Sequence, residues 1–308
     1  MDTRALWNVP RGLLMGAADV VPGVSGGTIA LVLNIYPRLV RSIRSGSSAL
    51  GALLRGDVAG FARWLRSVEW SFLIPLVAGI LIAVFSLAHV IEVALEEHPV
   101  PMAALFLGLV GGSVVIAWRL LTRRDARRLV IAVLVGAATF ALLGLTAAGG
   151  QTADAPRSVP LWAFFASGAI AICAMILPGI SGSFILVMLG MYASVLAAVT
   201  SADILTIVVF AAGAAVGLGL FSQVLHWALE RYYDNVVAAL IGLMIGSVRV
   251  LWPWPDGVDS TALEAPDSSV GLAALLAVAG FALVLLVTWA SERVQRIEAA
   301  DEVRELKA

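Results

Sequence analysis

Six long apolar runs dominate the chain, and charged residues gather mainly between them. The runs lie near 71–95, 101–118, 129–148, 204–228, 235–252 and 270–290. Each run is about as long as an α-helix must be to cross a bilayer, roughly 20 residues. The pattern therefore predicts an all-α integral membrane protein.

Two further apolar segments are each interrupted by a Pro-Gly-x-Ser-Gly motif. The copies are Pro22-Gly23-Val24-Ser25-Gly26-Gly27 and Pro178-Gly179-Ile180-Ser181-Gly182-Ser183, and the match continues without a gap through Ile29/Ile185, Leu33/Leu189 and Tyr36/Tyr192. A helix breaker inside a membrane segment frees backbone amides that lipid cannot satisfy, so protein or a polar cavity must surround it. Two related breaks in one chain are typical of a transport site formed between two repeats.

The internal repeat extends beyond the motif. Residues 76–118 align with 210–252 at a shift of 134, whereas the motif aligns at a shift of 156. Identical pairs include Gly79/Gly213, Leu95/Leu229, Glu96/Glu230, Gly108/Gly242, Gly112/Gly246, Ser113/Ser247 and Trp118/Trp252. The first half therefore carries about 22 extra residues between its motif and its next span, and they fall within 38–68.

Arginine placement predicts how the two repeats are oriented. Basic residues cluster at 38–66, 119–128 and 293–307, whereas 96–101 and 253–269 contain no Lys or Arg. Cytoplasmic loops carry the excess of basic residues, so all clusters are cytoplasmic if each motif segment is a re-entrant hairpin. If each segment crossed once instead, the basic tail would lie outside. We therefore predict an inverted repeat in which each half is one re-entrant helical hairpin plus three transmembrane helices.

These patterns divide the chain into two repeats and a tail. The first repeat, 1–150, has its hairpin at about 10–40, an inner-leaflet segment at 38–68 and three spans; the second, 151–292, has its hairpin at about 160–200 and three spans; residues 293–308 form a cytoplasmic tail. Segment 38–68 mixes arginine with apolar residues, as in a helix lying on anionic lipid. We expect this segment either to anchor the topology or to help recruit a lipid headgroup. We expect a multi-pass protein of the cytoplasmic membrane with both termini cytoplasmic.

Composition narrows the class further. Of the 308 residues, 60% are hydrophobic and 13% are charged, whereas about a quarter are charged in an ordinary soluble domain. Cys173 is the only cysteine, which excludes a disulfide or a cysteine metal cluster. The apolar stretch 12–18 is short and Asp19 follows at once, so we expect no cleaved signal peptide. We also expect no cofactor, no metal and no nucleic-acid partner.

Each break has the chemistry of an anion site. After the helix breaks at Pro22, Gly23, Pro178 and Gly179, a second half-helix begins, and its unpaired amides and dipole attract negative charge. Glycine lets an anion approach the backbone, and hydroxyls add donors. The predicted phosphate-binding residues are Ser25, Gly26, Gly27, Thr28, Ser181, Gly182 and Ser183, with Arg249 as a further candidate. The alternatives are that the small residues permit close helix packing and that the arginine snorkels to the outer interface.

Three side chains are candidates for ion coupling. Asp19 stands three residues before Pro22, and its counterpart in the second half is Met175. A carboxylate at membrane depth is costly and usually functional, so Asp19 carries a proton, binds a cation or caps the neighbouring half-helix. His89 and Glu92, toward the end of a span, are further candidates for a proton relay, with interface residues as the alternative.

The motif residues carry a resemblance to a known family. Residues 16–28, GAADVVPGVSGGT, with 177–183 in the second half, resemble the bacterial and archaeal polyprenyl-phosphate transporters of the PopT type. The resemblance covers nearly the whole chain. It implies movement of undecaprenyl phosphate or a related lipid carrier from the outer to the inner leaflet, for recycling in cell-envelope glycan synthesis. It assigns roles only to the motif positions, Asp19 included, and leaves proton or sodium coupling open.

Two other function classes compete with a lipid transporter. A small-anion transporter or channel can use the same helix-tip chemistry, although it predicts an enclosed pore rather than a site open sideways to the bilayer. A lipid phosphatase of the phosphatidic-acid type needs a histidine nucleophile with Lys and Arg around the phosphate. The chain has three histidines, none near a motif, and its one lysine is Lys307. We therefore expect a transporter and not an enzyme.

Overall fold

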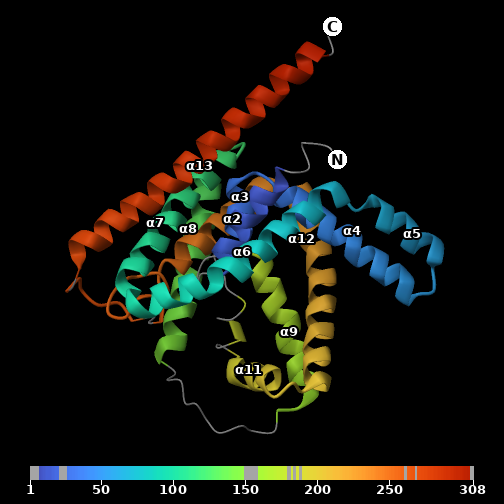
Figure 1. Ribbon diagram of the computed structural model, residues 1–308, viewed down its shortest axis with the longest axis horizontal. Coiled ribbons are helices and arrows are strands. Elements are labelled where there is room, and N and C mark those ends of the chain that lie inside the picture. The colour runs from blue at the N-terminus through green and yellow to red at the C-terminus, as the bar shows by residue number, and fades with distance from the viewer. Residues whose placement is uncertain are drawn as a thin grey trace.

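The computed structural model describes residues 7–20, 26–148, 159–178, 182, 185–186, 189–259, 262–267 and 269–305. Every element in these ranges is a helix and none is a strand, which confirms the all-α prediction. The elements are α2 (Asn8–Val20), α3 (Gly26–Val32), α4 (Tyr36–Leu54), α5 (Val58–Ser67), α6 (Trp70–Glu97), α7 (Pro99–Leu120), α8 (Ala126–Ala148), α9 (Leu161–Ile176), α11 (Tyr192–Thr200), α12 (Ile204–Ser247), the 3-10 turn η1 (Gly257–Asp259) and α13 (Val270–Glu305). Figure 1 shows α2 and α3 near the centre of the molecule.

Five helices in the described part of the chain are long and apolar enough to cross a membrane: α6, α7, α8, α12 and α13. They account for all six apolar runs, because α12 contains 204–228 and most of 235–252. Straight, its 44 residues would measure about 65 Å, roughly twice the hydrocarbon thickness of a bilayer. The helix breaks at Tyr232, whose φ of −136° and ψ of 41° are not helical. The two runs are therefore joined by a kink and not by a loop.

Close glycine crossings join the helix before each motif to the next span of the same half. In the first half, Gly12 on α2 lies against Gly79 on α6, and a Cβ at Gly12 would overlap the carbonyl of Leu76. The repeat counterparts, Gly168 on α9 and Gly213 on α12, make the same kind of crossing. Small residues that let two backbones touch are the usual device of helix packing in membranes. The sequence repeat is thus also a repeat of packing.

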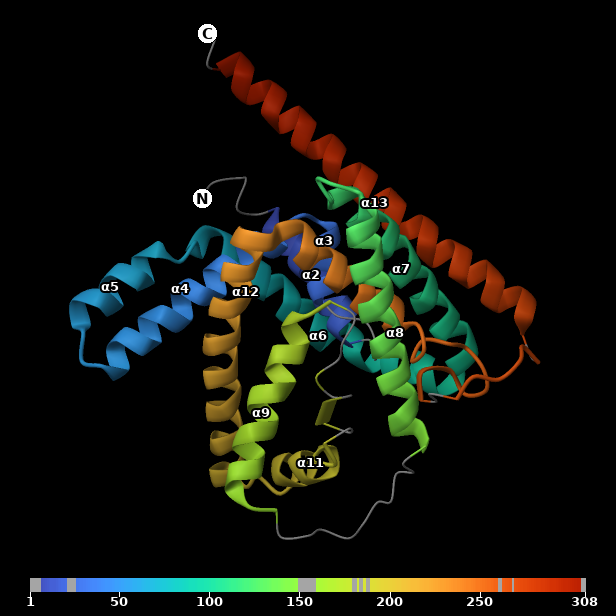
Figure 2. The same cartoon turned by 180° about the vertical axis from the view of Figure 1, so that it is seen from behind.

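A second pair of crossings ties the two halves together. Gly108 on α7 packs against the backbone of Ala277 on α13, and its counterpart Gly242 on α12 packs against the backbone of Ala132 on α8. Helix α7 runs beside α13 in both views (Figure 1, Figure 2). The second span of each half therefore contacts the last span of the other half, so the halves interlock.

The two motif segments end in the same turn. Asn34 has a φ of 56° and its counterpart Gly190 a φ of 66°, a left-handed conformation that asparagine and glycine adopt most readily. The next amide closes the turn in each copy, from Ile35 to the carbonyl of Ala30 at 2.9 Å and from Met191 to the carbonyl of Leu186 at 2.8 Å. At this turn, the sequence similarity of the two copies thus corresponds to the same backbone conformation.

The segment 38–68, expected to form one helix, forms two. Helix α4 ends at Leu54 and α5 begins at Val58, after Asp57 caps it by accepting a hydrogen bond from the amide of Gly60 at 2.7 Å. Both helices project from one side of the molecule (Figure 1, Figure 2). Arg38 fixes their base, because its Nε lies 2.6 Å from Glu69 Oε2 at the start of α6.

Candidate functional site

The first motif brings a carboxylate to the start of α3. Asp19, near the end of α2, accepts a hydrogen bond at Oδ1 from the backbone amide of Gly26, with an N···O distance of 2.6 Å. This amide is the first of the second half-helix, and a carboxylate is well placed there because the amide and the helix dipole are both complementary to negative charge. Of the three roles expected for Asp19, the structure shows the cap. Pro22, Gly23 and Ser25 lie outside the described residues.

The second motif repeats this geometry with different chemistry. Met175 lies against Gly182, so that a Cβ on the glycine would overlap its side chain, just as a Cβ on Gly26 would overlap Asp19. A thioether is only a weak acceptor, whereas a carboxylate accepts strongly. Negative charge is therefore supplied by the protein at the first motif and not by the equivalent residue at the second. Pro178 is buried beside the end of α9, and Gly179, Ser181 and Ser183 lie outside the described residues.

Thr28 supplies an unusual buried hydroxyl on α3. The residue is only 1% exposed, and its Oγ1 has no hydrogen-bond partner among the described residues. A buried polar group without a partner costs about 1–3 kcal/mol. Gly26 and Gly27, the other predicted anion ligands on this helix, are also buried. The predicted site therefore contains a donor that an added oxyanion would satisfy.

Tyr36 links the two motif segments directly. Its buried hydroxyl donates a hydrogen bond to the carbonyl of Ile176, at the end of α9, with an O···O distance of 3.0 Å. Ile176 stands two residues before Pro178, and it shares one hydrophobic cluster with Leu31 of α3. Sequence reasoning gave Tyr36 no role, although it belongs to the gapless match with Tyr192. The structure thus brings the end of the first motif against the start of the second.

Replacing Tyr36 by phenylalanine is expected to lower the free energy of unfolding by about 1–2 kcal/mol, because the carbonyl of Ile176 would lose its buried donor. Tyr192→Phe is the matched control: this counterpart is 44% exposed, so its loss should cost under about 0.5 kcal/mol. Denaturant titration of both variants in detergent micelles measures the difference. Equal costs would show that the Tyr36 hydroxyl does not hold the two segments together.

Arg249 lies on a different interface from the motif glycines. It follows α12, and its guanidinium stacks 4.9 Å from the ring centroid of Phe140 on α8 and packs on Gly144 of the same helix. Its Nε is buried without a hydrogen-bond partner among the described residues. The described contacts of Arg249 are thus with α8, and a role at the phosphate remains a prediction.

The remaining ion-coupling candidates lie on α6. His89 and Glu92 belong to this helix, but their side chains are outside the described residues. No group of three or more His, Cys, Asp or Glu side chains that could hold a metal occurs in the described part of the chain.

Together these features define a class. The chain is a multi-pass helical membrane protein in which two segments, related by an internal sequence repeat, contact each other through Tyr36 and Ile176. It belongs to the undecaprenyl phosphate translocase-like (VCA0040-like) family, whose model matches residues 15–267.

Two relatives carry the same printed name. A protein of Vibrio cholerae named "Polyprenyl-phosphate transporter" is 42% identical over 247 residues, which are 80% of this chain and 77% of the relative. A protein of Staphylococcus aureus with that name is 31% identical over 258 residues, 80% of this chain and 86% of the relative. No solved structure matches the chain.

Proposed function

We propose that this protein moves undecaprenyl phosphate, or a related polyprenyl phosphate, from the outer to the inner leaflet of the cytoplasmic membrane. This step would return the lipid carrier for another round of cell-envelope glycan synthesis. The observation that carries the proposal is the similarity, over 80% of the chain, to two relatives named as polyprenyl-phosphate transporters. Those relatives also favour a transporter over an enzyme.

The proposed phosphate site is formed by the two motif tips. The pairing of the Asp19 carboxylate with the Gly26 amide at 2.6 Å supports an oxyanion site at the start of α3. In our proposal the substrate phosphate replaces that carboxylate and also accepts from the Thr28 hydroxyl, while Gly182 contributes from the second motif. Arg249 would contact the phosphate when the site opens toward the outer face.

Competition at one amide suggests how transport is coupled. A phosphate dianion and an ionised carboxylate repel each other at such close range. Asp19 would therefore take up a proton or a sodium ion when the phosphate arrives, and would release it when the phosphate leaves. His89 and Glu92 would relay protons in the proton-coupled version. This exchange would drive the lipid in one direction along an ion gradient.

The repeat supplies the proposed alternation between leaflets. We propose that the two halves have opposite orientations, with both termini and all the arginine clusters in the cytoplasm. Helices α4 and α5 would lie on the inner leaflet, because Leu50, Leu53 and Trp64 expose apolar surface on the same segment as Arg55 and Arg63. Anionic lipids would be their partners.

Liposomes test this function directly. We expect purified protein to expose inner-leaflet polyprenyl phosphate to a phosphatase added outside, so that cleavage passes from the outer pool alone to nearly the whole pool. Protein-free liposomes are the control. Chloride flux in the same preparation tests the alternative of a small-anion transporter or channel. Chloride movement in liposomes whose lipid cleavage stays limited to the outer pool would overturn our proposal in favour of that alternative.

A further inference from the structure

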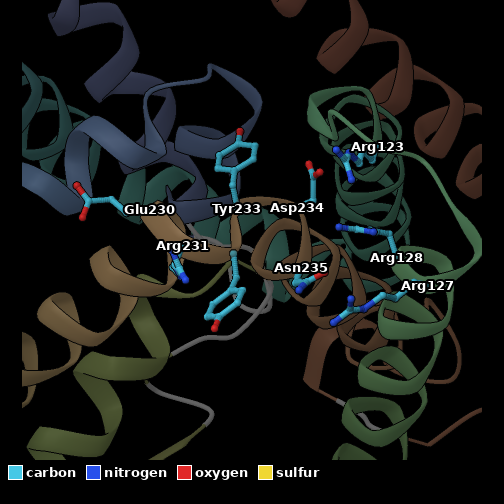
Figure 3. Close-up of a pocket in the computed structure, with 9 residues that line it drawn as sticks. Arg123, Arg127, Arg128, Glu230, Arg231, Tyr233, Asp234 and Asn235 are labelled. Carbon is cyan, nitrogen blue, oxygen red and sulfur yellow. The ribbon is translucent and has the colours of Figure 1, made fainter.

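A polar pocket lies at the kink of α12, and none of the described motif residues lines it. It has a volume of about 350 Å³ and is formed between the start of α8, the α7–α8 loop and the kink itself. Figure 3 shows Asp234 and Asn235 facing the arginines of the α7–α8 loop and of α8, with Glu230 and Arg231 on the other side of Tyr233. The lining side chains that carry the argument are Arg123, Arg127, Arg128, Arg231, Asp234 and Asn235.

The pocket has an excess of positive charge. Its four arginines outnumber its two carboxylates, Glu230 and Asp234. Both carboxylates have other partners: Asp234 accepts from the amide and the hydroxyl of Thr122, at 2.8 and 2.7 Å, and Glu230 lies 3.1 Å from His226. The lining residues therefore carry a net charge of +2, of which Asp125, outside the lining but paired with Arg128, offsets one.

The bonds of Asp234 also fix the shape of the pocket. Because Thr122 belongs to the α7–α8 loop, they hold this loop against the kinked helix. Arg128 is positioned by Asp125, three residues earlier in the chain, whose carboxylate lies 2.6 Å from its guanidinium. The backbone amide of Arg128, followed by its guanidinium, holds the pKa of Asp125 below its usual value. This pair is ionised at neutral pH.

Two buried atoms in the pocket have no partner. Arg128 Nε and Asn235 Oδ1 are both buried without a hydrogen bond among the described residues. In Figure 3 the Arg128 side chain extends from α8 toward Asn235 and Asp234. An asparagine amide can be turned so that its NH₂ group takes the place of its oxygen. An oxyanion in the pocket would then accept from both side chains and satisfy both.

We propose that this pocket binds a phosphoryl group. Guanidinium groups match the geometry of phosphate oxygens and keep their charge at all physiological pH values. The group could be carried by a lipid, because the pocket lies where the spans α8 and α12 meet their connecting segments, or by free phosphate. A bound phosphate would join Arg128 on α8 to Asn235, three residues after the break at Tyr232, and so hold α8 against the kink. Only the lipid source rests on the function proposed above.

Binding to the full-length protein tests the proposal. Inorganic phosphate is titrated calorimetrically into protein in detergent, and polyprenyl phosphate is supplied in phosphatidylcholine nanodiscs and counted by native mass spectrometry. We expect Arg128→Gln and Arg127→Gln to weaken binding about tenfold or more, since each removes a charge-assisted bond. Arg124→Gln is the matched control and should bind within about twofold of the unchanged protein: this arginine is on the same loop, bonds the carbonyl of Arg119 at 2.9 Å and does not line the pocket.

The two probes separate the sources of the phosphate. If the pocket variants lose binding of inorganic phosphate alone, the pocket binds a soluble ion. If they lose binding of polyprenyl phosphate, the pocket binds a lipid headgroup. Equal binding by the unchanged protein and by both pocket variants, or no binding of either probe, overturns the proposal. Arg127 is exposed, so its substitution leaves the fold intact and this outcome remains interpretable. If the protein transports lipid although neither probe binds the pocket, the proposed function stands and only the proposal of a phosphoryl site in this pocket fails.

Discussion

Asp19→Asn is expected to reduce polyprenyl-phosphate transport at least about tenfold while leaving the protein folded. Asparagine keeps the size of the side chain and can still accept from the Gly26 amide at 2.6 Å, but it carries no charge. A charge-assisted hydrogen bond contributes roughly 1.5–3 kcal/mol, and its exchange for phosphate is the step that we propose to couple to an ion. The phosphatase-protection assay in liposomes, with and without a pH or sodium gradient, measures both the rate and its response to the gradient.

The second motif supplies the matched control for this prediction. Met175 occupies the position equivalent to Asp19 and lies against Gly182 as Asp19 lies against Gly26. Met175→Leu preserves volume and apolar character, so it should transport within about twofold of the unchanged protein, since such swaps cost under about 1.5 kcal/mol. Transport by Asp19→Asn at the unchanged rate, still responding to the gradient, would eliminate Asp19 as the coupling group.

Gly12→Ala and Gly213→Ala are each expected to lower the free energy of unfolding by about 3 kcal/mol or more. In both cases the added Cβ would overlap a backbone carbonyl, that of Leu76 or of Phe165. Overpacking costs about 1–3 kcal/mol when side chains can adjust, and a carbonyl within a helix can adjust less. Denaturant unfolding in mixed micelles, followed by circular dichroism, gives the free energies.

Gly51→Ala distinguishes this steric effect from the general effect of removing a glycine. A Cβ at Gly51 on α4 would meet nothing within 4 Å, so alanine should stabilise the helix there by about 0.5–1 kcal/mol. If all three variants changed stability alike, the crossings would not be the close contacts that hold α2 to α6 and α9 to α12.

The sequence predicted the helices well because membrane spans depend on a simple quantity, the length of an apolar run. It also predicted the repeat, since the glycines that permit close crossings must stay glycine in both halves. It did not predict that two spans form the single bent helix α12, because a kink at Tyr232 leaves no breaker in the sequence. The split of 38–68 into two helices depends on a local cap at Asp57.

At the predicted site, the motif named candidate residues but not their partners. Asp19 was expected as a cap or a carrier, and only the fold shows it on the Gly26 amide. The bond from Tyr36 to Ile176 joins residues 140 positions apart, which local patterns cannot reveal. The pocket at the kink likewise combines arginines from two regions of the chain. Long-range contacts of this kind are set by packing, not by the residues near them in sequence.

The interlocked crossings also fix the order in which the protein can be completed. Helix α7 presents Gly108 and Gly112 to α13, yet α13 begins at Val270, 150 residues beyond the end of α7 at Leu120. During synthesis from the N-terminus, that face of α7 therefore waits without its partner while α8, α9 and α12 are made and inserted. Only the synthesis of α13 supplies that partner, so a ribosome that stops before residue 270 leaves Gly108 and Gly112 without the helix they pack against.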